Sequence, residues 1–413
     1  MNRGRLTIVA IILTTVSAAL LGAAGAQSTA PSSLVETGRY LATAANCISC
    51  HSRKGGAPFA GGVAFETGFG TLYSTNITQD PKAGIGSWTQ SQFMRAMREG
   101  IRADGEHLYP AFPYTAFTKL SDADIGAIYA YLKSVPASTD RAPENKLSFP
   151  FNQRSAMIAW KALYLDDARY APNAKQSAEW NRGAYLVEAL GHCGACHTPR
   201  NSQGAERKEW ALTGGTYNDN VPGGKTRAWS AVNLTQAPSG LGTWSVDEIT
   251  SYLKTGLNSF ATSFGPMNAV ITNSTSQLTP SDVRAIAVYL KSLPAKGQPA
   301  TAAATADELR TGQSLYAIHC GTCHLPTGKG SRDTGPSMVG NPVVQATDPA
   351  SLINVILYGP ELPNPPPPLQ RMHMDPYESE LDDDEIAAIA SYMRSAWGNR
   401  GGAVSVDQVA AQR

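Results

Sequence analysis

The stretch Cys47-Ile48-Ser49-Cys50-His51 recurs twice, with changes only at its two middle positions. The copies are Cys193-Gly194-Ala195-Cys196-His197 and Cys320-Gly321-Thr322-Cys323-His324, and the three motifs contain all six cysteines of the 413-residue chain. Six cysteines are too few for a small secreted disulfide scaffold. A motif repeated at long intervals indicates instead one structural unit per copy.

The sequence around each motif repeats as well. A glycine stands eight to ten residues upstream of each motif, at Gly38, Gly183 and Gly312. Downstream, apolar residues at helical spacing predict a closing amphipathic helix at residues 120–135, 278–293 and 381–397. In each of these helices a tyrosine follows the opening leucine by eleven residues, at Tyr131, Tyr289 and Tyr392. We therefore predict a mainly α fold of three small helical domains in series.

The first two units share further segments. Residues 74–78 (Ser-Thr-Asn-Ile-Thr) correspond to 231–235 (Ala-Val-Asn-Leu-Thr), and a short helix is predicted to end at Gly100 and again at Gly256. The third unit carries the proline-rich stretch 359–368 instead. The predicted organisation is domain 32–140, an interdomain helical segment 141–177, domain 178–296, a linker 297–305, domain 306–400 and a tail 401–413.

The spacing C-x-x-C-H is typical of covalent c-type haem attachment. Two thiols add to the haem vinyl groups, and the next residue, histidine, lies under the iron, so one helical turn supplies all three contacts. A thioredoxin-like redox pair needs neither the adjacent histidine nor three copies, and a zinc ribbon would place a second C-x-x-C much closer. We predict three haem c groups, attached at Cys47 and Cys50, Cys193 and Cys196, and Cys320 and Cys323, with iron bound by His51, His197 and His324.

The sixth iron ligand should come from a loop before each closing helix, and a methionine there raises the reduction potential. In the second unit Met267, in the stretch Phe-Gly-Pro-Met, is the candidate. In the third unit Met374 is preferred and Met372 is the alternative. Met338 and Met393 are expected to pack in the core.

The first unit departs from this pattern. Its loop reads His107-Leu-Tyr-Pro-Ala-Phe112-Pro-Tyr, with a phenylalanine where a methionine is expected, and phenylalanine cannot bind iron. His107 and a displaced methionine such as Met97 are the remaining candidates. The first haem is then ligated by two histidines, ligated by that methionine, or open on one side.

The balance of charged residues restricts the possible partners, and the N-terminal sequence indicates the cellular compartment. Lys and Arg number 34 against 33 Asp and Glu, without a basic cluster, which excludes a nucleic-acid binder. Residues 1–26 combine two arginines, an apolar run and a small-residue site, a pattern typical of a cleaved secretory signal peptide. An uncleaved membrane anchor is the alternative. We expect a periplasmic protein that associates with the cytoplasmic membrane only peripherally.

Over residues 34–399 the chain resembles the triheme cytochrome c subunits of membrane-bound periplasmic dehydrogenases of acetic acid bacteria and other proteobacteria. The segments that carry the resemblance are 73–78, 107–114, 179–186, 191–200 and 392–399. It implies three tandem class I cytochrome c-like domains, the histidine ligands above, and Met267 and Met374 as sixth ligands. The family's first-unit methionine stands where this chain has Phe112.

The resemblance also implies a role in electron transfer. Such subunits take electrons from a catalytic subunit of the quinoprotein, flavoprotein or molybdenum type, which oxidises an alcohol, sugar, sugar acid or aldehyde, and pass them to ubiquinone or a terminal oxidase. No catalytic constellation is evident in this sequence, so no chemistry of its own is expected. The alternatives are a peroxidase-like enzyme at an open first haem, with His107 and Glu106 nearby, and a free-standing multihaem shuttle.

Overall fold

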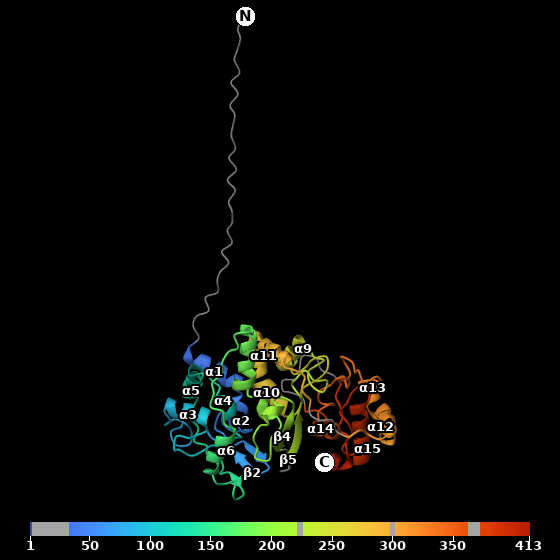
Figure 1. Ribbon diagram of the computed structural model, residues 1–413, viewed down its shortest axis with the longest axis horizontal. Helices are drawn as coiled ribbons and strands as arrows, with labels where there is room; N and C mark the ends of the chain where they lie inside the picture. The colour runs from blue at the N-terminus through green and yellow to red at the C-terminus, as the bar shows by residue number, and fades with distance from the viewer. Residues whose placement is uncertain (2–32, 221–225, 298–301, 362–371) are drawn as a thin grey trace. The chain divides into compact units, whose positions relative to one another are not determined.

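Helices make up most of the regular structure, and the strands are short and antiparallel (Figure 1). The computed structural model describes Met1 and residues 33–220, 226–297, 302–361 and 372–413. Apart from Met1, the predicted signal peptide 1–26 lies outside the described residues. Within the described part, no helix has both the length and the apolar character needed to cross a bilayer.

We refer to residues 32–140, 178–296 and 306–400 as the first, second and third repeats. The first contains α1 (Leu34–Ala44), α2 (Cys47–His51), β1 (Ala64–Thr67), β2 (Gly70–Tyr73), α3 (Gln90–Glu99), α4 (Tyr114–Phe117) and α5 (Asp122–Leu132). The segment after it contains β3 (Lys146–Leu147), which pairs with β2, and α6 (Ala156–Tyr164). The second contains α7 (Ala178–Tyr185), the π-helix η1 (Leu186–Leu190), α8 (Gly194–His197), η2 (Lys208–Trp210), the β4 (Gly215–Asn220) and β5 (Thr226–Ala231) hairpin, α9 (Val246–Thr255), α10 (Pro266–Asn273), η3 (Thr275–Gln277) and α11 (Pro280–Ser292). The third contains α12 (Ala306–His319), α13 (Gly321–His324), α14 (Ala350–Tyr358) and α15 (Asp383–Ser395), and α16 (Val406–Ala410) follows it.

The closing helices α5, α11 and α15 begin two residues later than predicted, because the opening leucine lies outside the helix. The next side chain in each case, of Ser121, Thr279 or Asp382, caps the helix by accepting a backbone N–H three residues on. The leucine and the residue five positions after it are buried in every repeat, which is the spacing of a hydrophobic staple. These pairs are Leu120 and Ile125, Leu278 and Val283, and Leu381 and Ile386.

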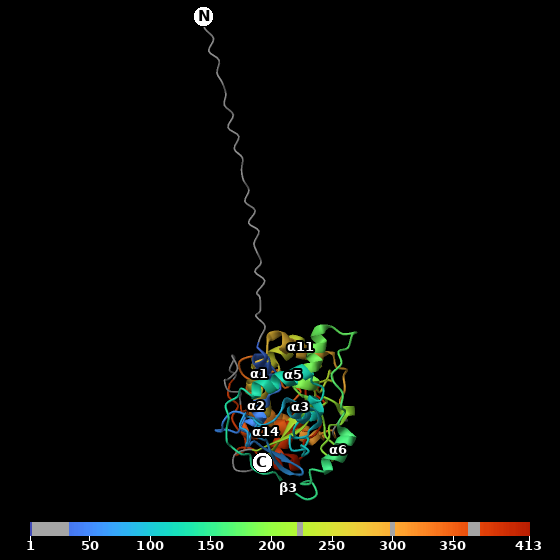
Figure 2. The same ribbon diagram turned by 90° about the vertical axis from the view of Figure 1, so that its left-hand side faces the viewer.

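In each repeat the helix before the motif crosses the closing helix at the predicted glycine. A Cβ atom on Gly38 would lie 1.8 Å from the carbonyl oxygen of Ala127 in α5. The corresponding distances are 1.9 Å from Gly183 to Ala285 and 2.1 Å from Gly312 to Ala388. Figures 1 and 2 both show α1 beside α5. The glycine is therefore required for the close approach of two helix backbones.

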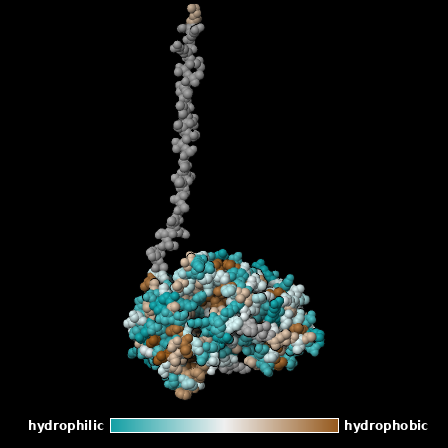
Figure 3. Space-filling model, in the orientation of Figure 1, coloured by the Kyte–Doolittle hydropathy of each residue, from teal (hydrophilic) through white to brown (hydrophobic). Residues whose placement is uncertain are grey.

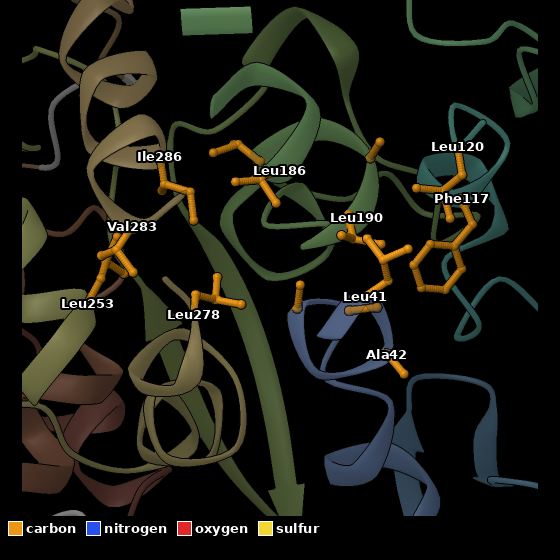
Figure 4. Close-up of a cluster of buried hydrophobic side chains, with 14 of the residues drawn as sticks. Leu41, Ala42, Phe117, Leu120, Leu186, Leu190, Leu253, Leu278, Val283 and Ile286 are labelled. Carbon is orange, nitrogen blue, oxygen red and sulfur yellow. The ribbon is translucent and has the colours of Figure 1, made fainter. Parts of the chain in front are cut away.

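The first and second repeats share one hydrophobic core. Leu41 of α1, Leu120 before α5, Leu190 of η1 and Val283 of α11 are all buried in the same cluster (Figure 4). The third repeat has a separate cluster that includes Met338 and Met393, as expected for these two methionines. Burial of apolar surface therefore joins the first two repeats more closely than it joins the third to them.

Hydrogen bonds between the first two repeats are reciprocal. The Tyr40 hydroxyl of the first repeat donates to Asp282 of the second at 2.6 Å, and the Tyr185 hydroxyl of the second donates to Asp124 of the first. Each hydroxyl also accepts a backbone N–H from the cap residue of the same closing helix. Arg182 forms a two-pronged ion pair with Asp282, at 2.9 and 2.7 Å.

The third repeat joins the second through a serine pair. The backbone N–H of Ser230 in β5 donates to the Ser351 side chain at 2.9 Å, and the N–H of Ser351 in α14 donates to the Ser230 side chain at 3.1 Å. Asn354, one turn further along α14, donates to the Ala228 carbonyl at 2.7 Å. The second repeat therefore contacts both of the others.

We expect Asp282→Asn to weaken the contact between the first two repeats in a pH-dependent way. Burial alone would raise the pKa of Asp282, but the hydrogen bonds from Arg182 and Tyr40 outweigh it and hold the pKa below its usual value. The ionised carboxylate therefore stabilises the fold above about pH 4, and this contribution is lost as the pH falls through the lowered pKa. Urea unfolding should show a loss of about 1–3 kcal/mol at pH 7 that shrinks below pH 3. An equal loss at both pH values would contradict this.

Candidate haem-binding sites

Each motif lies on a single turn of helix. The five residues of the first motif form α2, and α8 and α13 begin directly after the first cysteine of the other two. The second cysteine and the histidine of each motif therefore lie on one short helix, and the first cysteine is either its first residue or its N-cap, so one turn of chain presents all three side chains as covalent attachment to one haem requires.

One ring nitrogen of each motif histidine is already held by the backbone. The Nδ1 atoms of His51, His197 and His324 lie 2.7, 2.7 and 2.9 Å from the carbonyl oxygens of Thr75, Val232 and Pro336. A carbonyl only accepts, so each Nδ1 carries the proton and each Nε2 presents a lone pair, the arrangement of a metal-bound histidine.

The protonation states of these histidines agree with metal binding. Burial lowers the pKa of His51 and His197 and outweighs the opposing effect of their backbone hydrogen bonds. The neutral imidazole is therefore the favoured form, and it is the form that binds a metal.

The sequence interpretation did not identify the carbonyl acceptors, although a signal for two of them was present. Thr75 and Val232 occupy the same position in the matching segments 74–78 and 231–235. The third repeat lacks this segment and uses Pro336. Beside it, a Cβ atom on Gly335 would lie 2.9 Å from Cε1 and Nδ1 of His324, so a larger residue would displace the ring.

The motif cysteines are partly buried, and none of them is joined in a disulfide. Burial raises the pKa of Cys47, Cys193 and Cys320 to about 12 and that of Cys50 to about 11. A redox-active C-x-x-C pair needs a lowered pKa instead. Across the residues that the structure describes, no three Cys, His, Asp or Glu side chains gather as a structural zinc site requires. This chemistry fits thiols that are consumed by thioether bonds.

A continuous cavity of about 1570 Å³ reaches all three motifs, and its wall includes Cys50, Cys196 and Cys323. A pocket for a single small ligand measures roughly 300–1,000 Å³, so this space can hold more than one large apolar group. The indole N–H groups of Trp229 and Trp244 on the wall are buried without a protein partner. Acceptor oxygens inside the cavity, such as haem propionates, would satisfy them. The residues present therefore fit haem.

The first and second motifs lie close together in this cavity. After burial, the largest contribution to the raised pKa of Cys50 is the charge of Cys196 from the other repeat. Helix α10 of the second repeat contacts α2 of the first, where the Asn273 side chain donates to Ser49 at 2.9 Å. Groups attached to these two motifs would therefore be neighbours.

The structure places two predicted sixth ligands on the cavity wall. Met267 is the second residue of α10, after Gly265, which has φ of 57° and approaches the Trp229 ring so closely that a Cβ there would lie 3.0 Å from it. In the third repeat Met374 lines the cavity and is half-buried, whereas Met372 also lines it but is 61% exposed. This placement favours Met374 over Met372. The assignments of Met267 and Met374 as sixth ligands stay predictions.

In the first repeat the cavity wall includes Phe112 but neither His107 nor Met97. Met97 is 5% exposed and packs in the shared core. The Nδ1 atom of His107 is buried without a hydrogen-bond partner, at a position outside the wall. The structure thus brings neither candidate to the haem cavity.

The helix crossings and motif sites of the first and third repeats lie in segments that match cytochrome c families. Residues 35–136 match the cytochrome c family, and residues 307–393 match the family of cytochrome c oxidase, cbb3-type, subunit III. The chain is 43% identical to one of the subunits of nicotinate dehydrogenase from Pseudomonas putida over 87% of its own length, but it spans only 30% of that protein.

Two further relatives match along most of both chains. The fructose dehydrogenase cytochrome subunit of Gluconobacter japonicus is 38% identical, over 91% of this chain and 82% of the relative. The cytochrome c subunit of the quinone alcohol dehydrogenase of Gluconobacter oxydans is also 38% identical, over 94% and 84%. The chain belongs to the family of cytochrome c subunits of bacterial dehydrogenases.

Proposed function

We propose that this chain is a three-haem electron-transfer subunit of a periplasmic dehydrogenase complex associated with the cytoplasmic membrane. It takes electrons from a catalytic subunit and passes them to ubiquinone or a terminal oxidase. The observation that carries the proposal is the threefold site: each C-x-x-C-H histidine donates Nδ1–H to a backbone carbonyl and faces one common cavity. The protein then tunes potentials through ligands and burial and makes no bonds itself.

A contact surface supports the assignment to a complex. Phe149 before α6 and Ile158 on it are 80% and 58% exposed and lie outside the haem cavity, whereas the exposed Phe151 and Leu163 line that cavity. Figure 3 shows apolar residues gathered around α6, at the lower left of the view. Exposed apolar residues that cluster in this way are typical of protein or membrane contacts.

The oxidised substrate is proposed to be a heteroaromatic acid or an aldehyde. The supporting observation is the identity of 43% to the nicotinate dehydrogenase relative, against 38% to the cytochrome subunits of the fructose and alcohol dehydrogenases. Phe112 stands where the family that the chain resembles has a methionine, and this departure is consistent with a partner of the molybdenum type. An alcohol or a sugar is the second candidate.

The test is purification of the chain from its native membranes with its partners. We expect three covalent haems per chain by haem-to-protein ratio and co-purification of a large catalytic subunit. We also expect haem reduction on addition of nicotinate or an aldehyde, and none with ethanol or fructose.

Other outcomes separate the alternatives. Fewer than three haems would contradict the proposal, and isolation of the chain without any partner would indicate a free-standing shuttle. Peroxide turnover by the isolated chain would indicate an enzyme acting at the first haem. Reduction by ethanol or fructose alone would leave the electron-transfer role intact and exclude only the substrate class.

A further inference from the structure

Helix α6 lies in the segment between the first two repeats and contacts both of them. Trp160 and Tyr164 donate to the backbone and side-chain oxygens of Gln203 in the second repeat, at 2.9 and 2.8 Å. The Lys161 ammonium donates to the carbonyls of Glu99 and Gly100, at 2.6 and 3.3 Å, where α3 ends. Just before the helix, Arg154 donates to the His107 carbonyl at 2.9 Å. Helix α6 is therefore held against the loop 107–114, from which a sixth ligand of the first haem would ordinarily come.

The inner side of α6 forms part of the haem cavity. Met157 and Trp160 both line it, with Phe112 of the loop. Met157 and Phe112 also pack against the same small cluster of buried residues, which contains Tyr114 and Trp160. A thioether thus lines the same cavity, and packs against the same buried cluster, as the aromatic ring that replaces the expected ligand. Sulfur of this kind is a good soft donor to haem iron.

The other donors near this part of the wall are engaged elsewhere or lie off it. Met94 and Met97 are outside the wall, and the Met94 sulfur accepts from Arg98 at 3.4 Å. His107 is outside it as well. His192 lines the cavity, where a hydrogen bond from its Nε2 to the Ala45 carbonyl at 3.2 Å holds the ring, so that Nδ1 is the one nitrogen left to it as a donor. Among the described residues beside Phe112, Met157 is the one that offers a thioether to the cavity.

We propose that Met157 is the sixth ligand of the first haem, supplied by the interdomain helix α6 in place of the loop. The proposal rests on the proposed function, because it requires a haem attached at Cys47 and Cys50. It makes the first haem low-spin with one histidine and one methionine ligand, like the other two. It also assigns α6 a role in setting the potential of that haem.

The test is the holoprotein with Met157→Leu, a substitution of similar volume that cannot bind iron. Near-infrared magnetic circular dichroism of the oxidised wild type should show three low-spin haems. The variant should lose about one third of the methionine-to-iron charge-transfer intensity, gain one high-spin haem, and bind one carbon monoxide per chain when reduced. Met157→His should restore three low-spin haems without restoring the lost thioether intensity.

Met97→Leu is the matched control, because Met97 is a buried methionine of the first repeat, close in the sequence to the loop 107–114, that lies off the cavity. It should leave the spectrum unchanged. A wild type that already contains one high-spin haem, or three low-spin haems in Met157→Leu with undiminished thioether intensity, would overturn the assignment. The haem-to-protein ratio of the same samples keeps the two proposals apart: a ratio below three in the wild type contradicts the three-haem function itself. The two unaltered haems report whether the variant is folded.

Discussion

Gly183→Ala should destabilise the chain by about 3 kcal/mol, because the new methyl group would meet backbone. Its carbon would lie 1.9 Å from the Ala285 carbonyl oxygen and 2.8 Å from the Cβ atom of Tyr289. Neither atom can move by a side-chain rotation, so relief requires α7 and α11 to separate. Urea unfolding, followed by helical circular dichroism, measures the loss.

Gly68→Ala is the matched control for this prediction. Gly68 lies in the turn between β1 and β2, has no positive φ, and an added Cβ would have no neighbour within 4 Å. Its effect should stay within about 0.5 kcal/mol. Similar losses in both variants would show that the helix crossing is not the sensitive contact.

The second large effect is expected from Cys193→Ala combined with Cys196→Ala. Loss of both thioether bonds should release the middle haem, so that the haem-to-protein ratio falls from three to two. The second repeat shares its core with the first and its serine pair with the third. Under the proposed function, removal of its haem should therefore stop electron transfer from the catalytic subunit to the acceptor, measured as the rate at which the purified complex reduces an added quinone.

Met267→Leu controls for the effect of haem loss as such. It keeps the thioether bonds of the second motif and removes only the predicted sixth ligand, so the ratio should stay at three. The midpoint potential of one haem should fall by something on the order of 100 mV, within the range of about 0.8 V that axial ligands span. If the double cysteine variant kept its full rate, electrons would bypass the second repeat.

Features encoded by short patterns could be predicted from the sequence. The three motifs, the glycine before each, and the closing helices follow from local spacing, and Gly38 and Ala127 meet as a repeated helix crossing would require. The helices predicted to end at Gly100 and Gly256 do end there, with positive φ of 59° and 75°. The end of such a helix depends on the backbone conformation of one glycine, so a local pattern is enough to predict it.

Contacts made over long distances in the sequence could not be predicted in the same way. A carbonyl has no side-chain signature, so the partners of the motif histidines were not identified. The sequence also leaves open which face of α6 packs against the rest of the fold, because apolar residues occur on both the buried and the exposed face of this helix. Trp160 is 8% exposed and Leu163 is 72% exposed on the same helix. Only the fold brings Met157 and Phe112 to the same buried cluster.

The reciprocal tyrosine and aspartate contacts relate the first two repeats to each other as a symmetric pair. Tyr40 reaches Asp282 while Tyr185 reaches Asp124, and in each pair the residues hold equivalent positions in the two repeats. This exchange is the defining property of an isologous interface between identical subunits. The first two repeats therefore contact each other as the two subunits of a homodimer do, although one chain supplies both. The third repeat is attached through a different surface and takes no part in this exchange.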